Sequence, residues 1–284
     1  MLRNLRLPIA LVAALAFALS GACNDSTDSV ESGFTIHFID VGQGDATLIT
    51  TEDGERLLVD GGRSKSRIID RLDALGVDGL DAILATHADA DHIAGLVAVL
   101  EEDYQLERIY WNGQMSDTKT FESFMNLWDE EGAEVLVVSR GDTISLGELT
   151  IRVLHPGGLT GDSNVDSIVL LVGCGTVDVL LTGDAEIPSE ESMIDAGVLV
   201  EVDVLKVGHH GSRTATSPEF LEAIQPEYGV ISAGMNSQYG HPHIETLEAL
   251  NAAEVQVLLT DTTPDPDGVT LTTDCSDLAL VEMP

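Results

Sequence analysis

The sequence has 284 residues, of which 44% are hydrophobic, and its formal net charge at pH 7 is −36. A chain of this length can bury a substantial core, and one layered domain is the simplest arrangement. Such an excess of acidic side chains repels free polyanions at long range, which argues against broad binding of nucleic acids. It is typical of a solvated surface in salty or extracellular surroundings.

The N-terminal segment, residues 1–22, has the pattern of an export signal peptide. Two arginines precede an apolar run, Leu7 to Leu19, and small residues stand directly before Cys23. The run is shorter than the roughly 20 residues that a transmembrane helix needs, which favours a cleaved signal. The ending also resembles a bacterial lipobox, so Cys23 carries either a lipid that attaches the protein to the membrane or an unmodified thiol. We expect an extracytoplasmic protein, secreted or lipid-anchored.

From Phe34 onward, short β-rich runs alternate with amphipathic stretches, without an internal repeat or a long linker. We therefore expect a flexible, polar tether over residues 23–33 and one domain over residues 34–284. The pattern predicts strands and then a helix early in this domain: strands 34–40, 46–51 and 56–60, and a helix over 68–75.

The rest of the domain is dominated by units in which a strand, a polar loop and a helix follow one another. Mixed strands followed by such units predict an α/β fold, a four-layer αββα sandwich with two packed sheets inside and helices outside. The expected elements are strands 81–86, 177–182, 202–207, 228–232 and 255–260, and helices over 92–100, from near 188, and over 242–253.

Two cysteines, Cys174 and Cys275, remain in the domain. In an oxidising compartment two distant cysteines can pair, and no Cys-x-x-Cys spacing offers a structural zinc site. The two thiols form a disulfide, or both are simply buried.

Four candidate metal ligands, His87, Asp89, Asp91 and His92, lie within six residues after the strand 81–86. Side chains at successive loop positions diverge, so two can face one metal ion and two another. Imidazole and carboxylate groups suit zinc, manganese or iron. A surface loop with capping aspartates would explain one of these residues, but it does not readily explain four.

Two later strand ends carry further candidates. Asp184 follows the strand 177–182, where it either binds metal or caps the helix that starts near residue 188. His209 and His210 follow the strand 202–207, and one of them is the natural ligand while the other packs or supports it, because adjacent side chains diverge.

Several segments carry a resemblance to the metallo-β-lactamase superfamily. The pattern His-x-Asp-x-Asp-His is similar to the superfamily signature His-x-His-x-Asp-His, with Asp89 standing where the second histidine usually stands. Within the superfamily, residues 34–245 resemble the extracellular hydrolase domain of ComEC competence proteins. The shared segments are Asp-Val-Gly-Gln-Gly-Asp-Ala (40–46), Leu-Val-Asp-Gly-Gly (58–62), Leu-Thr-Gly-Asp (181–184), Leu-Lys-Val-Gly-His-His-Gly-Ser (205–212) and Tyr-Gly-His-Pro (239–242).

The resemblance implies two divalent metal ions, zinc or manganese, and a role for each candidate. Asp60 looks like a buried aspartate that hydrogen-bonds near the metals, unless it only forms a turn. His241 looks like a substrate-facing residue that holds a phosphate oxygen or protonates a leaving group, unless it only starts a helix. The implied ligands are His87 and Asp89 for one metal, Asp91, His92 and His209 for the other, and Asp184 as the bridge.

One ligand of the superfamily has no counterpart here. A further histidine usually precedes the Gly-Asp strand, whereas the matching stretch, residues 164–167, contains none. Either His155 compensates, or it is a turn residue and the first metal site is weak or vacant.

We expect an exported metal-dependent hydrolase in which Asp184 positions a hydroxide between two metals and His241 assists. The ComEC resemblance implies a phosphodiesterase or nuclease, with a phosphoester such as single-stranded DNA as substrate. One alternative is a non-catalytic metal-binding module of the same fold, which the missing histidine makes thinkable. Another is a phosphocholine esterase-like enzyme, since those enzymes carry similar His-His-Gly-Ser motifs; β-lactam hydrolysis is disfavoured.

Overall fold

The computed structural model of this chain describes residues 33–102, 104–234, 239–261 and 268–281. These residues belong to one compact unit. The expected export signal, Cys23 and the tether up to residue 32 lie outside the described residues. None of the helices in the described ranges is long and apolar enough to cross a membrane.

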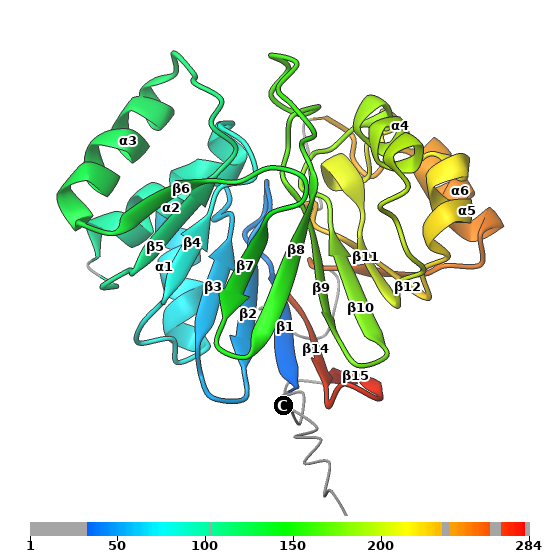
Figure 1. The fold of residues 1–284 in the computed structure, drawn as a ribbon, viewed down its shortest axis with the longest axis horizontal. Coiled ribbons are helices and arrows are strands. Elements are labelled where there is room, and N and C mark those ends of the chain that lie inside the picture. Colours follow the sequence, from blue (N-terminus) through cyan, green and yellow to red (C-terminus); the bar gives the residue numbers. More distant parts are fainter. Residues whose placement is uncertain (1–32, 103, 235–238, 262–267, 282–284) are drawn as a thin grey trace, which may run out of the picture. The chain divides into compact units, whose positions relative to one another are not determined.

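The strands of this unit form two sheets (Figure 1). The first has the order β15-β14-β1-β2-β3-β4-β5-β6 and the second β13-β12-β11-β10-β9-β8-β7. The first sheet contains β1 (Phe34–Ile39), β2 (Thr47–Thr51), β3 (Arg56–Val59), β4 (Ala82–Leu84), β5 (Arg108–Trp111), β6 (Glu134–Val137), β14 (Gly268–Thr273) and β15 (Leu278–Val281). The second contains β7 (Thr143–Leu146), β8 (Leu149–His155), β9 (Val169–Cys174), β10 (Val177–Leu181), β11 (Val204–Lys206), β12 (Tyr228–Ile231) and β13 (Gln256–Leu259).

Helices cover the outer face of each sheet, as the two flanks of Figure 1 show. One buried apolar cluster joins the first sheet to α1, α2 and α3, and another joins the second sheet to α4, α5 and α6. The predicted four-layer αββα sandwich is therefore confirmed. The helices are α1 (Lys65–Ala74), α2 (Ala90–Glu101), α3 (Lys119–Glu131), α4 (Ile187–Ala196), α5 (Pro218–Ile224) and α6 (Ile244–Ala252).

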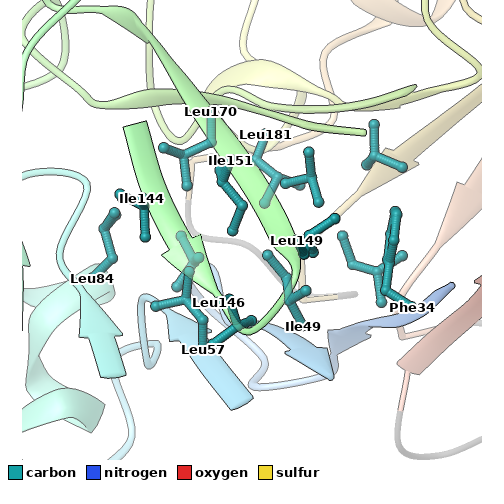
Figure 2. Packing of buried hydrophobic residues seen from close by; sticks show 14 of the residues in the cluster. Phe34, Ile49, Leu57, Leu84, Ile144, Leu146, Leu149, Ile151, Leu170 and Leu181 are labelled. Atoms are coloured by element: carbon teal, nitrogen blue, oxygen red, sulfur yellow. The ribbon is translucent and has the colours of Figure 1, made fainter. Parts of the chain in front are cut away.

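The central core lies between the two sheets. Leu57 and Leu84 of the first sheet and Ile151 and Leu181 of the second belong to one cluster of buried side chains (Figure 2). Along β8, burial alternates at first: Leu149, Ile151 and Val153 belong to this core, whereas Thr150 and Arg152 are exposed. Burial of apolar side chains on facing sheets is what holds the two inner layers together.

Helix α2 comes unusually close to the loop after β3. A Cβ atom on Gly95 would lie 1.8 Å from the carbonyl oxygen of Gly61, so only glycine permits this approach. Two backbone hydrogen bonds fix the contact, from Gly61 to the carbonyl of His92 at 2.7 Å and from Gly95 to that of Gly62 at 2.9 Å. The first turn of α2 is thereby held against the end of β3.

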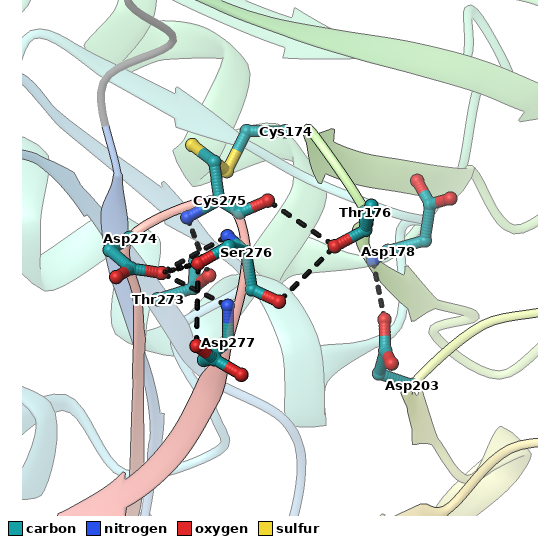
Figure 3. The surroundings of a disulfide bond; sticks show 9 residues. All are labelled: Cys174, Thr176, Asp178, Asp203, Thr273, Asp274, Cys275, Ser276 and Asp277. Carbon is teal, nitrogen blue, oxygen red and sulfur yellow. Dashed lines mark hydrogen bonds between the residues drawn. A yellow bond between two sulfur atoms is a disulfide. The ribbon is translucent and has the colours of Figure 1, made fainter.

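Cys174 and Cys275 form a disulfide (Figure 3), so the predicted pairing is confirmed and the alternative of two buried free thiols is wrong. It joins the end of β9 in the second sheet to the turn after β14 in the first. The Thr176 hydroxyl donates to the carbonyl of Ser276 at 3.2 Å beside it. The disulfide is therefore a covalent link between the two inner layers.

Candidate metal centre

The chemically active side chains gather at one edge of the sandwich, beyond the ends of four strands. Strands β3 and β4 are parallel neighbours in the first sheet, and β10 and β11 are parallel neighbours in the second. Parallel neighbours end at the same edge, so the residues that follow them meet there. Asp60 follows β3, residues 86–92 follow β4, Asp184 follows β10, and residues 208–211 follow β11.

Asp184 lies at the centre of this group and is buried. Its Oδ2 atom is 3.3 Å from Nε2 of His92 and 4.0 Å from Nε2 of His87. Its Oδ1 atom is 3.4 Å from Nε2 of His210. The N-cap of α4 is Glu186, so Asp184 does not cap that helix. One carboxylate thus faces histidines contributed by both sheets.

The polar atoms that face one another here lack hydrogen-bond partners. The Nε2 atoms of His87, His92 and His210 and the Oδ1 atom of Asp184 are all buried without a hydrogen bond. Unpartnered buried polar groups are costly, and several that converge need a common partner. Imidazole nitrogens and carboxylate oxygens are the donor set of zinc and manganese sites, so these residues fit a divalent metal ion.

Four overlapping groups of described side chains have the spacing that metal coordination needs, and two of them consist of candidate ligands alone. His87, His92 and Asp184 form one group and Asp91, His92 and His210 the other, with ligand atoms within 4.8 Å of one another in each. The second group is completed on the outside by Gln43, whose Nε2 atom donates to Oδ2 of Asp91 at 3.2 Å.

The other ring nitrogen of each histidine is held from behind. Nδ1 of His92 lies 2.7 Å from Oδ2 of Asp60, and Nδ1 of His210 lies 3.0 Å from the carbonyl oxygen of Ser232. A proton held at Nδ1 leaves Nε2 free to coordinate. Asp60 thus hydrogen-bonds near the site, as the resemblance implied.

The adjacent histidines diverge, as expected, but the inner one is His210. Both have left-handed backbone, with φ of 47° at His209 and 55° at His210. The His210 side chain is 2% exposed and belongs to a group with the spacing of metal ligands. The His209 side chain is 21% exposed and belongs to no such group among the described residues. Nε2 of His209 lies 3.7 Å from Oδ2 of Asp184, and its Nδ1 lies 3.0 Å from Oε1 of Glu186. The structure therefore brings His209 to the rim.

Asp89 lies at the opposite rim. Its side chain is 48% exposed, its Oδ2 atom is 3.8 Å from Nε2 of His87, and its Oδ1 atom accepts from Ser163 at 2.8 Å. A pocket of about 480 Å³ opens beside it, and Gln114 and Met115 also line this pocket. Asp89 is thus close to the cluster and exposed to whatever occupies the pocket.

His155 is not directed at the cluster. Its Nε2 atom donates to the carbonyl oxygen of Val165 at 2.8 Å, and its Nδ1 atom lies 3.4 Å from the Arg140 guanidinium. Both ring nitrogens are therefore engaged by neighbouring segments of the chain. This arrangement favours the alternative in which His155 is a turn residue rather than a metal ligand.

His241 lies beside the exposed histidine of the pair. Its ring centre is 5.5 Å from that of His209 and 6.2 Å from that of His210. Its Nδ1 atom is buried without a hydrogen bond. Burial and the neighbouring imidazoles, His209 first, lower the pKa of His241 to about 4, so its ring is neutral at pH 7.

Burial and charge also separate the protonation states inside the cluster. Burial, and then the charge of His92, lower the pKa of His87 to about 4. Burial alone would lower the pKa of His210 too, but the carboxylates of Asp184 and Asp45 raise it to about 10. The pKa of Asp184 is held well below its ordinary value, since His210 and His92 outweigh the effect of burial. Without metal, the cluster at pH 7 combines carboxylates, the charged imidazoliums of His92 and His210 and the neutral imidazole of His87.

Residues 39–234 match the metallo-beta-lactamase superfamily. ComE operon protein 3 of Bacillus subtilis is 35% identical over 247 residues, which cover 80% of this chain and 32% of that protein. The chain therefore spans about a third of the length of this relative.

Among solved structures, the fold is similar to the metallo-beta-lactamase fold protein YhfI of Bacillus subtilis. The TM-score is 0.60 and the sequence identity 15%, and the match covers 85% of this chain and 100% of the other. A diphosphatase from the PhnP family superimposes with a TM-score of 0.52, 17% identity, and coverage of 87% and 100%.

Proposed function

The chain belongs to the metallo-β-lactamase superfamily, and from that premise we propose that it is an exported, metal-dependent phosphodiesterase. Members of the superfamily are usually metal-dependent hydrolases. The observation that carries the proposal is the set of buried, unpartnered atoms of His87, His92, His210 and Asp184, which face one another.

In this proposal two divalent ions, zinc or manganese, are held by side chains from both sheets. His87 and Asp184, with Asp89 at the rim, hold one ion, and Asp184 is shared with the other. Bound there, the ions supply Lewis acidity and lower the pKa of a water molecule toward neutrality. The ligands of the second ion are Asp91, His92, His210 and Asp184, with His209 beside them at the rim.

The chain's own residues then position the phosphoester. His241 is neutral at pH 7 because its pKa is lowered to about 4. A neutral imidazole donates a hydrogen bond, so His241 is better suited to hold a phosphate oxygen than to protonate a leaving group. The pocket beside Asp89 has room for a leaving group next to the ligands.

Single-stranded DNA is our first candidate substrate, because the chain resembles competence proteins such as ComE operon protein 3. A small phosphodiester is the second, because the net charge of −36 opposes the approach of a polyanion. The disulfide between Cys174 and Cys275 favours an oxidising compartment. It supports the proposed export by residues 1–22, followed by secretion or lipid attachment through Cys23.

The proposal is tested by hydrolysis of bis(p-nitrophenyl) phosphate and of a single-stranded oligonucleotide with Mn²⁺ or Zn²⁺. We expect Asp184→Ala to lower turnover by at least about a thousandfold, since it removes the carboxylate shared by both ions. His210→Ala should be more damaging than His209→Ala, and circular dichroism should report an intact fold for each. If the wild type binds a divalent ion but cleaves no phosphodiester, the non-catalytic module becomes the better account.

A further inference from the structure

A buried ion pair lies behind the candidate metal centre and has no part in the reaction proposed above. Asp45, just before β2 in the first sheet, is 3% exposed, and Lys206, the last residue of β11 in the second sheet, is 2% exposed. Their Oδ2 and Nζ atoms are 2.7 Å apart. The pair therefore connects the two sheets that supply the metal-facing side chains.

Both partners make further hydrogen bonds to backbone groups. Lys206 donates a second hydrogen bond, of 3.0 Å, to the carbonyl oxygen of Val207. The backbone of Asp45 accepts from Gly62 at 2.8 Å and donates to the carbonyl of Asp91 at 3.3 Å. The loop that carries Asp45 is thus tied to the loop after β3 and to the start of α2.

The second carboxylate oxygen of Asp45 reaches a candidate ligand. Its Oδ1 atom lies 3.2 Å from Nδ1 of His210, the ring nitrogen opposite the one that faces Asp184. A carboxylate behind a ligating histidine fixes the orientation of the ring and its tautomer. The carbonyl oxygen of Ser232 accepts from the same Nδ1 atom at 3.0 Å, and Asp45 is placed to act beside it on the His210 ring.

Asp45 could also bind a metal ion itself. It forms one group with Asp184 and His210 and another with Asp60 and His92, and the ligand atoms in each lie within 4.8 Å of one another. The difference between a supporting residue and a ligand depends on where its oxygens are engaged. One oxygen is engaged by Lys206, and the other lies beside the Nδ1 atom of His210 rather than the Nε2 atom that faces Asp184.

We propose that Lys206 holds Asp45 as the positioning residue of His210 and keeps it from becoming a metal ligand. This inference rests on the proposed metal site. A buried ion pair adds little to stability relative to apolar residues of similar size, whereas removal of one partner leaves an uncompensated charge. Without Lys206, the uncompensated charge is the carboxylate of Asp45. Because it lies next to the proposed cation site, it turns toward the bound cation.

The test measures metal binding by the full chain rather than its activity. We expect Asp45→Asn to raise the dissociation constant for Mn²⁺ by about 10- to 100-fold, the usual loss when a group behind a ligand is removed. Lys206→Met should alter the Co²⁺ absorption spectrum, because a carboxylate joins the coordination sphere. The double variant Asp45→Asn/Lys206→Met contains neither buried charge, and it should regain the wild-type spectrum while binding Mn²⁺ weakly.

The exposed pair Lys65–Glu101, with a separation of 2.8 Å, provides matched controls. Lys65→Met and Glu101→Gln should leave both readouts unchanged. The inference is overturned if Asp45→Asn binds Mn²⁺ like the wild type, or if Lys206→Met has the wild-type Co²⁺ spectrum. If single variants do not fold, the double variant decides, since wild-type affinity there would equally overturn it. A wild type that binds neither ion would instead overturn the proposed function.

Discussion

At the residue scale, the site depends on backbone conformations that most residues avoid. His209, His210 and Asp60 all have positive φ, and each such residue costs about 1–3 kcal/mol. At the histidine pair this conformation turns one ring inward and the other to the rim. From sequence, the pair predicts that one histidine faces the metals, but the identity of that residue depends on the left-handed turn. Spacing alone does not reveal such a turn.

The contiguous residues were more predictable than the distant ones. His87, Asp91 and His92 could be recognised because one loop and one helix start carry them. Asp45 and Lys206 were not singled out, because nothing local indicates that a carboxylate and an ammonium from different sheets will meet in the core.

A pH-dependence follows from His155, which lies apart from the candidate ligands. Burial lowers its pKa, and the nearby Arg140 charge adds to the effect, while the hydrogen bond to Val165 opposes it. Its pKa in the unfolded chain is about 6.5, so the folded state resists protonation. His155 therefore leaves the free energy of unfolding unchanged above that pH and lowers it as the pH drops below it. We expect His155→Gln to reduce this acid sensitivity in urea titrations between pH 7 and 4.5. Equal slopes for His155→Gln and the wild type would contradict the assignment.

At the element scale, the strand ends determine where chemistry occurs. The predicted strands and helices around residues 34–100 and 177–260 are confirmed, because each has a distinct apolar run followed by a polar turn. The sequence pattern predicts no element between residues 101 and 176, where the structure has α3 and β5 to β9. Strand β6 could not be predicted from the pattern, because its four residues are largely exposed and lack the alternation of a half-buried strand.

The disulfide should contribute to stability because it closes a long loop between the two sheets. It joins cysteines separated by 101 residues, and a link of this kind typically adds about 2–4 kcal/mol to the free energy of unfolding. We expect the variant Cys174→Ser/Cys275→Ser to lose stability of that order in denaturant titrations. Cys23→Ser, which leaves the bond intact, is the control. Equal unfolding midpoints for the double variant and the wild type would show that the bond adds nothing.

At the scale of the whole molecule, two sheets meet over one core and both contribute candidate ligands. The net charge of −36 gives the molecule as a whole a negative long-range potential. A basic DNA-binding protein loses affinity as salt rises, because the release of counterions becomes less favourable. Here the dominant long-range effect is repulsion between chain and polyanion, which salt weakens.

The ionic-strength dependence of hydrolysis should therefore distinguish the two candidate substrates. We expect kcat/KM for a single-stranded oligonucleotide to rise several-fold between about 50 and 200 mM salt, since screening weakens the repulsion over that range. The value for bis(p-nitrophenyl) phosphate, with one charge, should change much less. Steady-state assays with a fixed Mn²⁺ concentration test this. A steep fall for the oligonucleotide would indicate a basic binding surface that the acidic composition does not suggest.

We propose that metal ions held by His87, Asp91, His92, His210 and Asp184 make this chain a phosphodiesterase. The most direct measurement is hydrolysis of bis(p-nitrophenyl) phosphate by chelator-stripped protein during stepwise addition of Mn²⁺, with bound metal counted at each step. Activity should be absent without metal and should rise to a plateau as bound metal approaches two ions per chain. Asp184→Ala should bind less metal and stay inactive at every step. Full activity in the stripped protein, or saturated metal binding without any hydrolysis, would contradict the claim.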